Sequence, residues 1–414
     1  MPSERAPQAV PVRAAGFSLA ILTFINLFNY LDRFVLASLV ESLKSSELHL
    51  SDKQLGALAA SFIIVYMLVS PLFGTLGDRK RRPPLLALGV GIWSLATALG
   101  GFARSFAGLL AARAGVGVGE AAYGTIAPAL LADFFPKEKR GRVFAVFFAA
   151  IPIGSAAGYI LGGTAEQKFG WRAAFWIAGG PGLLLALACL LLFDPPRGGQ
   201  DPGSGAAPQA GSVWSAYRRL LANRPYTWTV LGYAAYTFAL GGLAFWAPAF
   251  LERVRGMARN EATVNFGAIV VVTGFVGTFA GGWLGDWWLK RSRGGYLWLS
   301  GVATLAAAPA ALVAFVAPQK AVFLTAIVVA ELLLFASTGP INSAIVNLVA
   351  PNERATAVAL SILAIHLLGD VPSPPLIGAV SDATSLAHAF LILPVVIAAS
   401  GVLWMVAARS ATRA

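Results

Sequence analysis

The chain has 414 residues, of which 57% are hydrophobic and 12% are charged, and its mean hydropathy is +0.71. Soluble domains are about half apolar and about a quarter charged, so this composition excludes an ordinary water-soluble protein. A membrane-spanning helix takes about 20 residues, which leaves room for roughly ten to thirteen spans and no large soluble domain. The single cysteine, Cys189, excludes a disulfide framework, and the net charge of +12 is typical of a membrane protein with basic cytoplasmic loops.

Residues 1–15 are polar and predict a cytoplasmic N-terminal tail rather than a signal peptide. Twelve apolar stretches follow, and each predicts a transmembrane helix. Their bounds are 16–43, 52–77, 83–103, 106–134, 140–164, 171–193, 224–250, 262–288, 295–316, 320–349, 354–381 and 386–408. Residues 194–223 are rich in Pro, Gly and Ser and predict a flexible cytoplasmic linker. The linker separates an N-terminal six-helix half, 16–193, from a C-terminal half, 224–408, which a short tail, 409–414, follows.

The distribution of basic residues predicts how these helices cross the membrane. Of the 31 Lys and Arg residues, 20 fall in the tails and loops on the side of the N-terminus, nine in the opposite loops and two within spans. Because cytoplasmic loops carry the excess of Lys and Arg, both termini are predicted to be cytoplasmic.

The second half of the chain carries a weak copy of the first. Gly74–Asp78 (GTLGD) recurs as Gly282–Asp286 (GWLGD), and Pro136–Glu138 (PKE) recurs as Pro351–Glu353 (PNE). Repeats in the same order predict two parallel six-helix halves, related by an axis along the membrane normal, that rock about a central cavity. A static helical bundle is the alternative.

The first copy continues into a basic run, so that Gly74–Arg82 reads GTLGDRKRR. This loop between spans two and three resembles the signature of the major facilitator superfamily. The resemblance implies an all-α membrane protein with twelve transmembrane helices in two pseudo-symmetric halves, whose signature loops latch the cytoplasmic side. Asp78 and Arg142 are therefore predicted to be gating residues, together with Asp133 and, in the second copy, Asp286.

Two helical features predict close packing or movement. Gly154, Gly158 and Gly162 in span five are spaced by four residues, which allows close helix contact or bending. They resemble a glycine motif of exporters in the superfamily, and packing alone is the alternative. Pro372 and Pro374 in span eleven remove backbone donors and predict a kink.

No nucleotide-binding loop is present, because no Gly-Lys-Ser/Thr follows a glycine-rich turn. Transport is therefore expected to use an ion gradient or the gradient of the substrate itself. Neither a metal-binding cluster nor a nucleophile with a base stands out, so we expect no enzyme activity and no cofactor.

Span one carries a group of polar residues, and such residues inside spans are functional candidates by default. Asn29 and Arg33 are four residues apart and share one helical face, and Asp32 borders that face. Tyr30 is their neighbour in the chain.

Three later spans also carry ionisable residues. Arg113 and Glu120 in span four are seven residues apart and lie on one helical face. Glu331 in span ten is a candidate for the outer gate or for packing. His366 and Asp370 in span eleven are one turn apart, and the histidine is predicted either to bind a headgroup or relay protons or to be a hydrogen-bonded packing residue.

Two roles compete for the four charged residues of spans one and four. In the first, Asp32 and Arg33 neutralise Arg113 and Glu120 in fixed pairs that hold helices together. In the second, a carboxyl group takes up a proton when the access of an arginine changes, because burial favours the neutral carboxyl and a nearby arginine favours the charged form. An arginine also offers a planar fork for a phosphate or carboxylate.

Four stretches together resemble the Spinster family of lysolipid and sphingosine phosphate transporters. They are residues 29–33 (NYLDR), 113–123 (RAGVGVGEAAY), 236–248 (YTFALGGLAFWAP) and 366–374 (HLLGDVPSP). The short loops and the Ala/Gly-rich composition look like a bacterial member. The resemblance implies transport of amphipathic lipids with a charged headgroup, with proton coupling in some members.

This resemblance implies that Asp32 and Glu120 are proton or gating carboxylates and that Arg33 and Arg113 lie beside the headgroup. Together with the arguments above, it gives the following roles. Asp32 and Glu120 are predicted to couple transport to protons. The predicted substrate-binding residues are Arg33, Arg113, Asn29, Tyr30, His366 and Asp370. The predicted gating residues are Asp78, Arg142, Asp133, Asp286 and Glu331.

We therefore expect a proton-linked secondary transporter of lysophospholipid or sphingoid-phosphate-like lipids that works by alternating access. It is expected to be a monomer in the bacterial plasma membrane and not to bind nucleic acid. The alternatives are an exporter of drugs or small organic anions and, in a different class, a lipid-binding membrane receptor that does not transport.

Overall fold

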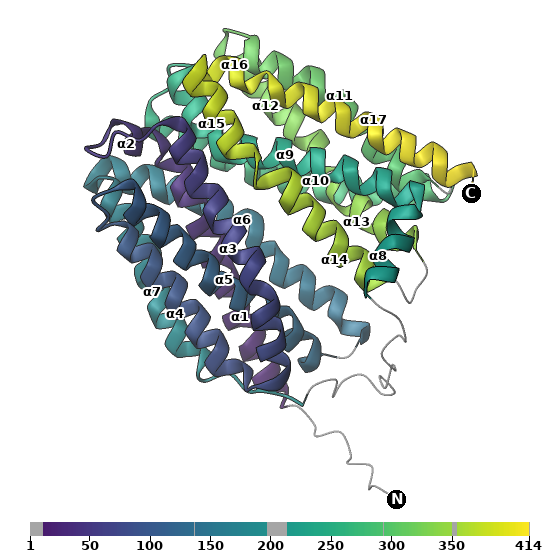
Figure 1. Ribbon diagram of the computed structural model, residues 1–414, viewed down its shortest axis with the longest axis horizontal. Helices are drawn as coiled ribbons and strands as arrows, with labels where there is room; N and C mark the ends of the chain where they lie inside the picture. The colour runs from purple at the N-terminus through teal and green to yellow at the C-terminus, as the bar shows by residue number, and fades with distance from the viewer. Residues whose placement is uncertain (1–10, 136, 197–212, 293, 350–353, 414) are drawn as a thin grey trace, which may run out of the picture. The chain divides into compact units, whose positions relative to one another are not determined.

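The computed structural model describes residues 11–135, 137–196, 213–292, 294–349 and 354–413, and the regular elements within these ranges are all helices (Figure 1). Eleven of the helical spans in these ranges are long and apolar enough to cross a membrane. Helix α5 (Phe106–Phe134) is not among the eleven, although its 29 residues are long enough. The charges of Arg113 and Glu120 lower the hydropathy of its middle. The prediction of an all-α membrane protein is confirmed.

The first part of the chain closely follows the predicted spans, except that the first span is divided at Leu39. Its helices are α1 (Val12–Ser38), α2 (Val40–Ser45), α3 (Asp52–Arg79), α4 (Arg82–Gly100), α5, α6 (Lys137–Phe169) and α7 (Trp171–Cys189).

The second part contains more breaks than the sequence predicts. A ten-residue helix, α8 (Val213–Ala222), forms within the predicted linker. The remaining helices are α9 (Arg224–Arg253), α10 (Arg259–Leu289), α11 (Gly295–Val316), α12 (Lys320–Phe335), α13 (Thr338–Asn347), α14 (Arg354–Ile365), α15 (Ser373–Ala383), α16 (Leu386–Phe390) and α17 (Ile392–Arg413). Span eleven is interrupted between α14 and α15 by a π-helical turn, η2 (His366–Asp370). The turn ends just before Pro372 and Pro374, which cannot donate backbone hydrogen bonds.

The described chain forms two compact units. The first takes the chain up to Leu43 and from Ser61 to residue 196, and the second takes Lys44–Ala60 and the residues from 213 onward. The second unit therefore also includes the first nine residues of α3.

In the first unit α1 packs along α6, and α4 lies between α5 and α7. The glycines of α6 make the first contact possible. A Cβ atom on Gly154 or Gly158 would collide with the backbone carbonyls of Leu27 and Leu31 respectively. The four-residue spacing of these glycines therefore allows close helix packing, as the sequence predicts.

In the second unit α17 packs against α9 and α11, and α12 packs against α10 and α11. Trp404 of α17 is fully buried and donates a hydrogen bond to the carbonyl of Thr229 at 3.0 Å. Buried indole groups need such a partner, so this bond fixes α17 against α9.

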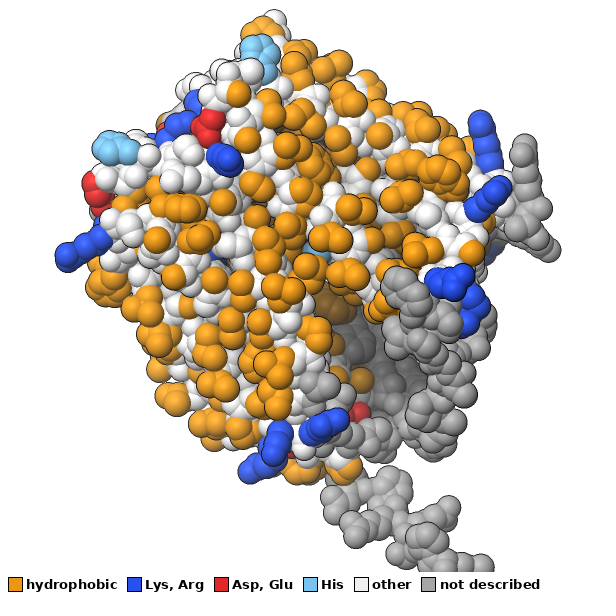
Figure 2. Space-filling view, viewed as in Figure 1, with side chains coloured by type: hydrophobic (Ala, Val, Ile, Leu, Met, Phe, Trp, Pro, Cys, Tyr) orange, Lys and Arg blue, Asp and Glu red, His pale blue; other side chains and the backbone are white. Residues whose placement is uncertain are grey.

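Many large apolar side chains are exposed, and Figure 2 shows hydrophobic side chains in orange across the visible surface. Leu68, Leu191 and Phe279 are each about 70% exposed (69%, 73% and 74%). Surfaces of this kind are unfavourable in water and suit contact with lipid chains.

Candidate functional site

The charged residues of spans one and four meet inside the first unit. Arg33 lies over Glu120, and its Nε and one terminal nitrogen are both 2.7 Å from the same carboxylate oxygen, Oε2. The Glu120 side chain is fully buried, whereas the Arg33 side chain is 26% exposed. The second oxygen of Glu120, Oε1, is buried and has no hydrogen-bond partner among the described residues.

Asp32 and Arg113 complete this cluster. Asp32 is 2% exposed, and its Oδ2 accepts a hydrogen bond of 2.5 Å from the hydroxyl of Thr97 in α4, while Oδ1 is buried without a partner in the described chain. Arg113 is 3% exposed, and its Nε and one terminal nitrogen also lack partners there. Arg113 lies within electrostatic reach of both Asp32 and Glu120.

Aromatic rings of α3 support both arginines. The guanidinium carbon of Arg33 lies 5.0 Å from the centroid of Phe62, and that of Arg113 lies 5.2 Å from the same ring. Tyr66 of α3 and Tyr30 of α1 also face Arg33, at 5.6 and 4.8 Å. A ring face attracts a desolvated cation, so Phe62 holds the two guanidinium groups on one aromatic surface.

The cluster has balanced formal charge but incomplete hydrogen bonding. Two buried carboxylate oxygens and two buried guanidinium nitrogens are without hydrogen bonds in the described part of the chain. Buried polar groups are normally hydrogen-bonded, and unsatisfied ones indicate strain, function or an occupant. The cluster therefore has free capacity for a proton on a carboxylate and for an anionic group on an arginine.

The other polar residues predicted in span one lie beside the cluster. Asn29 is 3% exposed, and Tyr30 is half-buried with its ring facing Arg33. The structure thus brings five predicted residues together, which are Tyr30, Asp32, Arg33, Arg113 and Glu120.

The predicted pair of span eleven lies in the second unit. His366 Nδ1 is 3.0 and 3.1 Å from the two carboxylate oxygens of Asp370, and both side chains are about a quarter exposed (25% and 24%). The pair is formed within the π-helical turn η2, so one segment positions both residues.

Glu331 is a buried carboxyl group of the second unit. It lies in α12, is 2% exposed and has the hydroxyl of Thr273 in α10 at 3.2 Å. No ion pair of Glu331 is formed within the described residues.

Two of the predicted gating residues, Asp133 and Asp286, lie in different surroundings. Asp133 forms a 2.5 Å ion pair with Arg82, which also contacts Asp194 at 2.6 Å and the carbonyl of Pro195 at 2.5 Å. This joins α4, α5 and the segment that follows α7 within the first unit. Asp286 is exposed and accepts a hydrogen bond of 2.7 Å from Tyr296.

Two further gating predictions, Asp78 and Arg142, fall on side chains outside the described part of the structure. Their backbones lie in the last turn of α3 and near the start of α6. Their gating role stays a prediction.

A charged network at the start of α3 was not predicted from the sequence. Asp52 is 1% exposed and contacts Arg253 at 2.5 and 3.1 Å, Lys44 at 2.7 Å and the hydroxyl of Ser381 at 2.6 Å. Asp382 accepts hydrogen bonds from the backbone N–H groups of Asp52 and the next residue at 2.9 and 2.8 Å. Within the second unit, these contacts hold the N-terminal end of α3 through both side chains and backbone.

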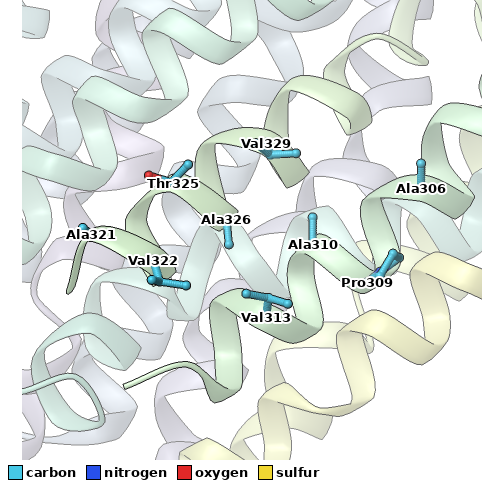
Figure 3. Close-up of a pocket in the computed structure, with 9 residues that line it drawn as sticks. All are labelled: Ala306, Pro309, Ala310, Val313, Ala321, Val322, Thr325, Ala326 and Val329. Carbon is cyan, nitrogen blue, oxygen red and sulfur yellow. The ribbon is translucent and has the colours of Figure 1, made fainter. Parts of the chain in front are cut away.

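Two grooves in the described chain are apolar and separate from these charges. A groove of about 690 Å³ lies between α11 and α12 (Figure 3), and Thr325 supplies the only side-chain oxygen among the residues that line it. A second groove, of about 360 Å³, lies between α1 and α6. None of the predicted site residues lines either groove.

Comparison with known proteins agrees with this architecture. A model of the major facilitator superfamily matches residues 22–374. Protein spinster homolog 3 of Danio rerio is 37% identical over 93% of this chain and 80% of its own length. The sphingosine-1-phosphate transporter SPNS2 of Mus musculus is 33% identical over 94% of this chain and 76% of its own length.

The fold also matches a solved structure over nearly its full length. A bacterial homolog to the human lysosomal transporter Spinster, in an inward-facing and unoccupied conformation, gives a TM-score of 0.84 at 27% identity. The match covers 98% of this chain and 97% of that one.

The fold and the matched family define a multi-pass membrane protein of the major facilitator superfamily. Within that superfamily the chain belongs to the Spinster family of transporters. The resemblance seen in the sequence is therefore confirmed.

Proposed function

We propose that the protein is a proton-linked secondary transporter of lysophospholipid or sphingoid-phosphate-like lipids that works by alternating access. It acts as a monomer in the bacterial plasma membrane with both termini in the cytoplasm. The name of the mouse relative, a sphingosine-1-phosphate transporter, supports this class of substrate.

The observation that carries the proposal is the incomplete bonding of Arg113. Its guanidinium group is buried beside Arg33, and two of its nitrogens have no hydrogen-bond partner in the described chain. A guanidinium group presents a planar fork that matches phosphate. We therefore assign the phosphate headgroup to Arg113 and the partly exposed Arg33, with Asn29 and Tyr30 beside it and with His366 and Asp370 as the substrate-binding residues of the second unit.

Proton coupling is assigned to Asp32 and Glu120 because Glu120 is buried in an ion pair with Arg33 and Asp32 is buried within electrostatic reach of Arg113. When a phosphate draws Arg33 or Arg113 away, the carboxylate that loses its arginine binds a proton more readily. The substrate and the carboxylates would thereby compete for the same two arginines, so that substrate binding and protonation of a carboxylate favour each other. The gating roles of Asp78, Arg142, Asp133, Asp286 and Glu331 remain part of this proposal.

The test is transport into sealed proteoliposomes that contain the purified full-length protein. A fluorescent lysophospholipid and a sphingoid phosphate should accumulate in response to an imposed pH difference, and an ionophore that collapses it should abolish the accumulation. Glu120→Gln and Asp32→Asn should remove the dependence on the pH difference, whereas Glu261→Gln, at an exposed carboxylate, should retain it. Unchanged coupling in both cluster variants would refute the assignment.

A headgroup series separates the remaining functions. Preference for drugs or small organic anions over lysolipids would indicate an exporter of that class. Binding without accumulation, also in counterflow, would indicate a receptor.

A further inference from the structure

Glu331 is a buried carboxyl group outside the charged cluster of the first unit. It lies eleven residues into α12, and Thr273 lies fourteen residues into α10, so both are near the middle of their spans. Glu331 is 2% exposed and Thr273 is fully buried. An ionised carboxylate at this depth is costly unless a cation or several donors compensate it.

The neighbouring helices offer no cation at this depth. Helix α11 contains no charged residue, and the basic residues of α10 and α12 are Arg259 and Lys320, at their first positions. Lys320 lies about 16 Å from Glu331 along the helix. These two basic residues are also paired, Arg259 with Glu252 and Lys320 with Glu261.

The remaining charged and titratable groups of the packed helices are distant or engaged. In α9, Arg224 and Arg253 occupy the two ends of the helix. Tyr236 of α9 is within electrostatic reach of Glu331, but its hydroxyl donates to the carbonyl of Leu334 at 2.8 Å and lies 3.2 Å from the hydroxyl of Thr338. Asp286, in the second half of α10, is exposed near the C-terminal end of that helix.

Close packing between α10 and α12 encloses the site. Thr273, Gly277 and Gly281 are spaced by four residues and share one face of α10. A Cβ atom on Gly277 would lie 2.8 Å from the carbonyl of Leu332, and one on Gly281 would collide with the backbone of Ala336. The two helices therefore leave little space for water beside Glu331.

The hydrogen bonds of Thr273 indicate where the hydrogen atoms lie. Its hydroxyl oxygen is 2.7 Å from the carbonyl of Ile269 and 3.2 Å from Oε2 of Glu331. A hydroxyl group has one hydrogen to donate and can accept two. If the shorter contact, to Ile269, takes that hydrogen, the longer contact is a full hydrogen bond only when Glu331 carries a proton and donates it to Thr273.

From this geometry we propose that Glu331 is a proton-binding site of the second unit, held in its protonated form with Thr273 as the acceptor. The site is additional to Asp32 and Glu120 and does not depend on the identity of the transported substrate. Glu331 then acts as a neutral hydrogen-bond donor between α10 and α12.

Infrared difference spectroscopy of the full-length protein in lipid nanodiscs tests this at about pH 6, well above the usual pKa of a glutamate of about 4.3. The wild-type spectrum minus that of Glu331→Gln should contain the carbonyl band of a protonated carboxyl group. The matched control Glu261→Gln, at an exposed carboxylate, should instead lose carboxylate bands. Carboxylate bands alone in the Glu331→Gln difference would overturn the proposal.

A second variant keeps the test decisive if Glu331→Gln does not fold. Thr273→Val preserves the shape of residue 273 and removes the acceptor. In wild type minus Thr273→Val the protonated carbonyl band should shift in frequency. A shift confined to carboxylate bands would show that Glu331 is ionised and would overturn the proposal.

Discussion

Asp32 receives its one described side-chain hydrogen bond from Thr97, a neutral residue on a different helix. The other oxygen of the same carboxyl group is buried without a partner among the described residues. Since a buried polar group that loses its partner costs its full desolvation, the hydroxyl of Thr97 has more effect on stability than its small size suggests.

Replacing Thr97 by Val should therefore destabilise the first unit although the side chains have nearly the same shape. We expect the free energy of unfolding to fall by about 1 to 3 kcal/mol, seen as a lower midpoint of thermal unfolding in detergent. Thr97→Ser, which retains the hydroxyl, should lie close to wild type. Equal midpoints for the Val and Ser variants would show that the hydrogen bond contributes nothing.

Phe62 contacts two guanidinium groups with one ring. Phe62→Leu keeps an apolar side chain but removes the ring face, and we expect a loss of about 0.5 to 2 kcal/mol from the cation–π contacts in addition to the loss of packing. Phe73→Leu replaces another buried phenylalanine of α3 and serves as the control that measures the loss of packing alone. Denaturation midpoints of the two variants should differ, and identical midpoints would contradict the role of the ring.

The sequence named the charged members of the cluster but not their neutral partners. Charges within spans are rare, so Asp32, Arg33, Arg113 and Glu120 stand out by their cost alone. Thr97 and Phe62 belong to residue types that are common in any span, and only the tertiary structure shows that they face the charges. The sequence also left open which arginine pairs with Glu120, because helical spacing does not determine the rotation of one helix against another.

At the scale of helices, the glycines of α6 and the prolines of span eleven show which local patterns are informative. Four-residue glycine spacing predicts close contact, and the contact with α1 is present. Pro372 and Pro374 predict a kink, and the π-helical turn η2 (His366–Asp370) lies just before them. The sequence contains no comparable signal for the division at Leu39, because neither proline nor glycine lies there. Helix α8 was not predicted either, because the prediction of a flexible linker depends on the composition of a longer stretch.

The glycine contact gives a prediction with an internal control. Gly158→Ala places a methyl group against the backbone of Leu31, and overpacking of this kind costs about 1 to 3 kcal/mol. Gly180→Ala, in α7, meets no atom within 4 Å and should be neutral or stabilise the helix by up to about 1 kcal/mol. The midpoint of thermal unfolding is measured for both variants. An equal decrease in the two midpoints would contradict the packing role of Gly158.

The network around Asp52 binds the end of α3 to α9 and α15. Arg253→Met should leave this buried carboxylate with fewer partners, and breaking a buried ion pair costs about 3 to 5 kcal/mol. Since Arg253 is 23% exposed, we expect a loss toward the lower end of that range, measured by thermal unfolding. Lys320→Met, which breaks the exposed pair with Glu261, should cost about 1 kcal/mol or less. A similar small loss for Arg253→Met would show that solvent replaces the pair.

At the scale of the whole molecule, the number of spans decides the topology. Hydropathy alone marks eleven spans in the described chain, and an odd number would place the termini on opposite sides of the membrane. Helix α5 adds the twelfth, and the residues that lower its hydropathy are Arg113 and Glu120 of the charged cluster. The two residues that we propose for headgroup and proton binding thus also make this helix the span that hydropathy does not detect.

Labelling with a membrane-impermeant maleimide tests directly whether the number of spans is odd or even. Cys189 is buried, so Cys189→Ala provides a cysteine-free background in which single cysteines are introduced at exposed positions. Arg13→Cys and Thr412→Cys, near the two ends, should both resist labelling in intact cells and react in inverted vesicles. Arg104→Cys, between α4 and α5, and Gln319→Cys, between α11 and α12, should react in intact cells. Labelling of the two ends from opposite sides would mean that α5 does not cross the membrane.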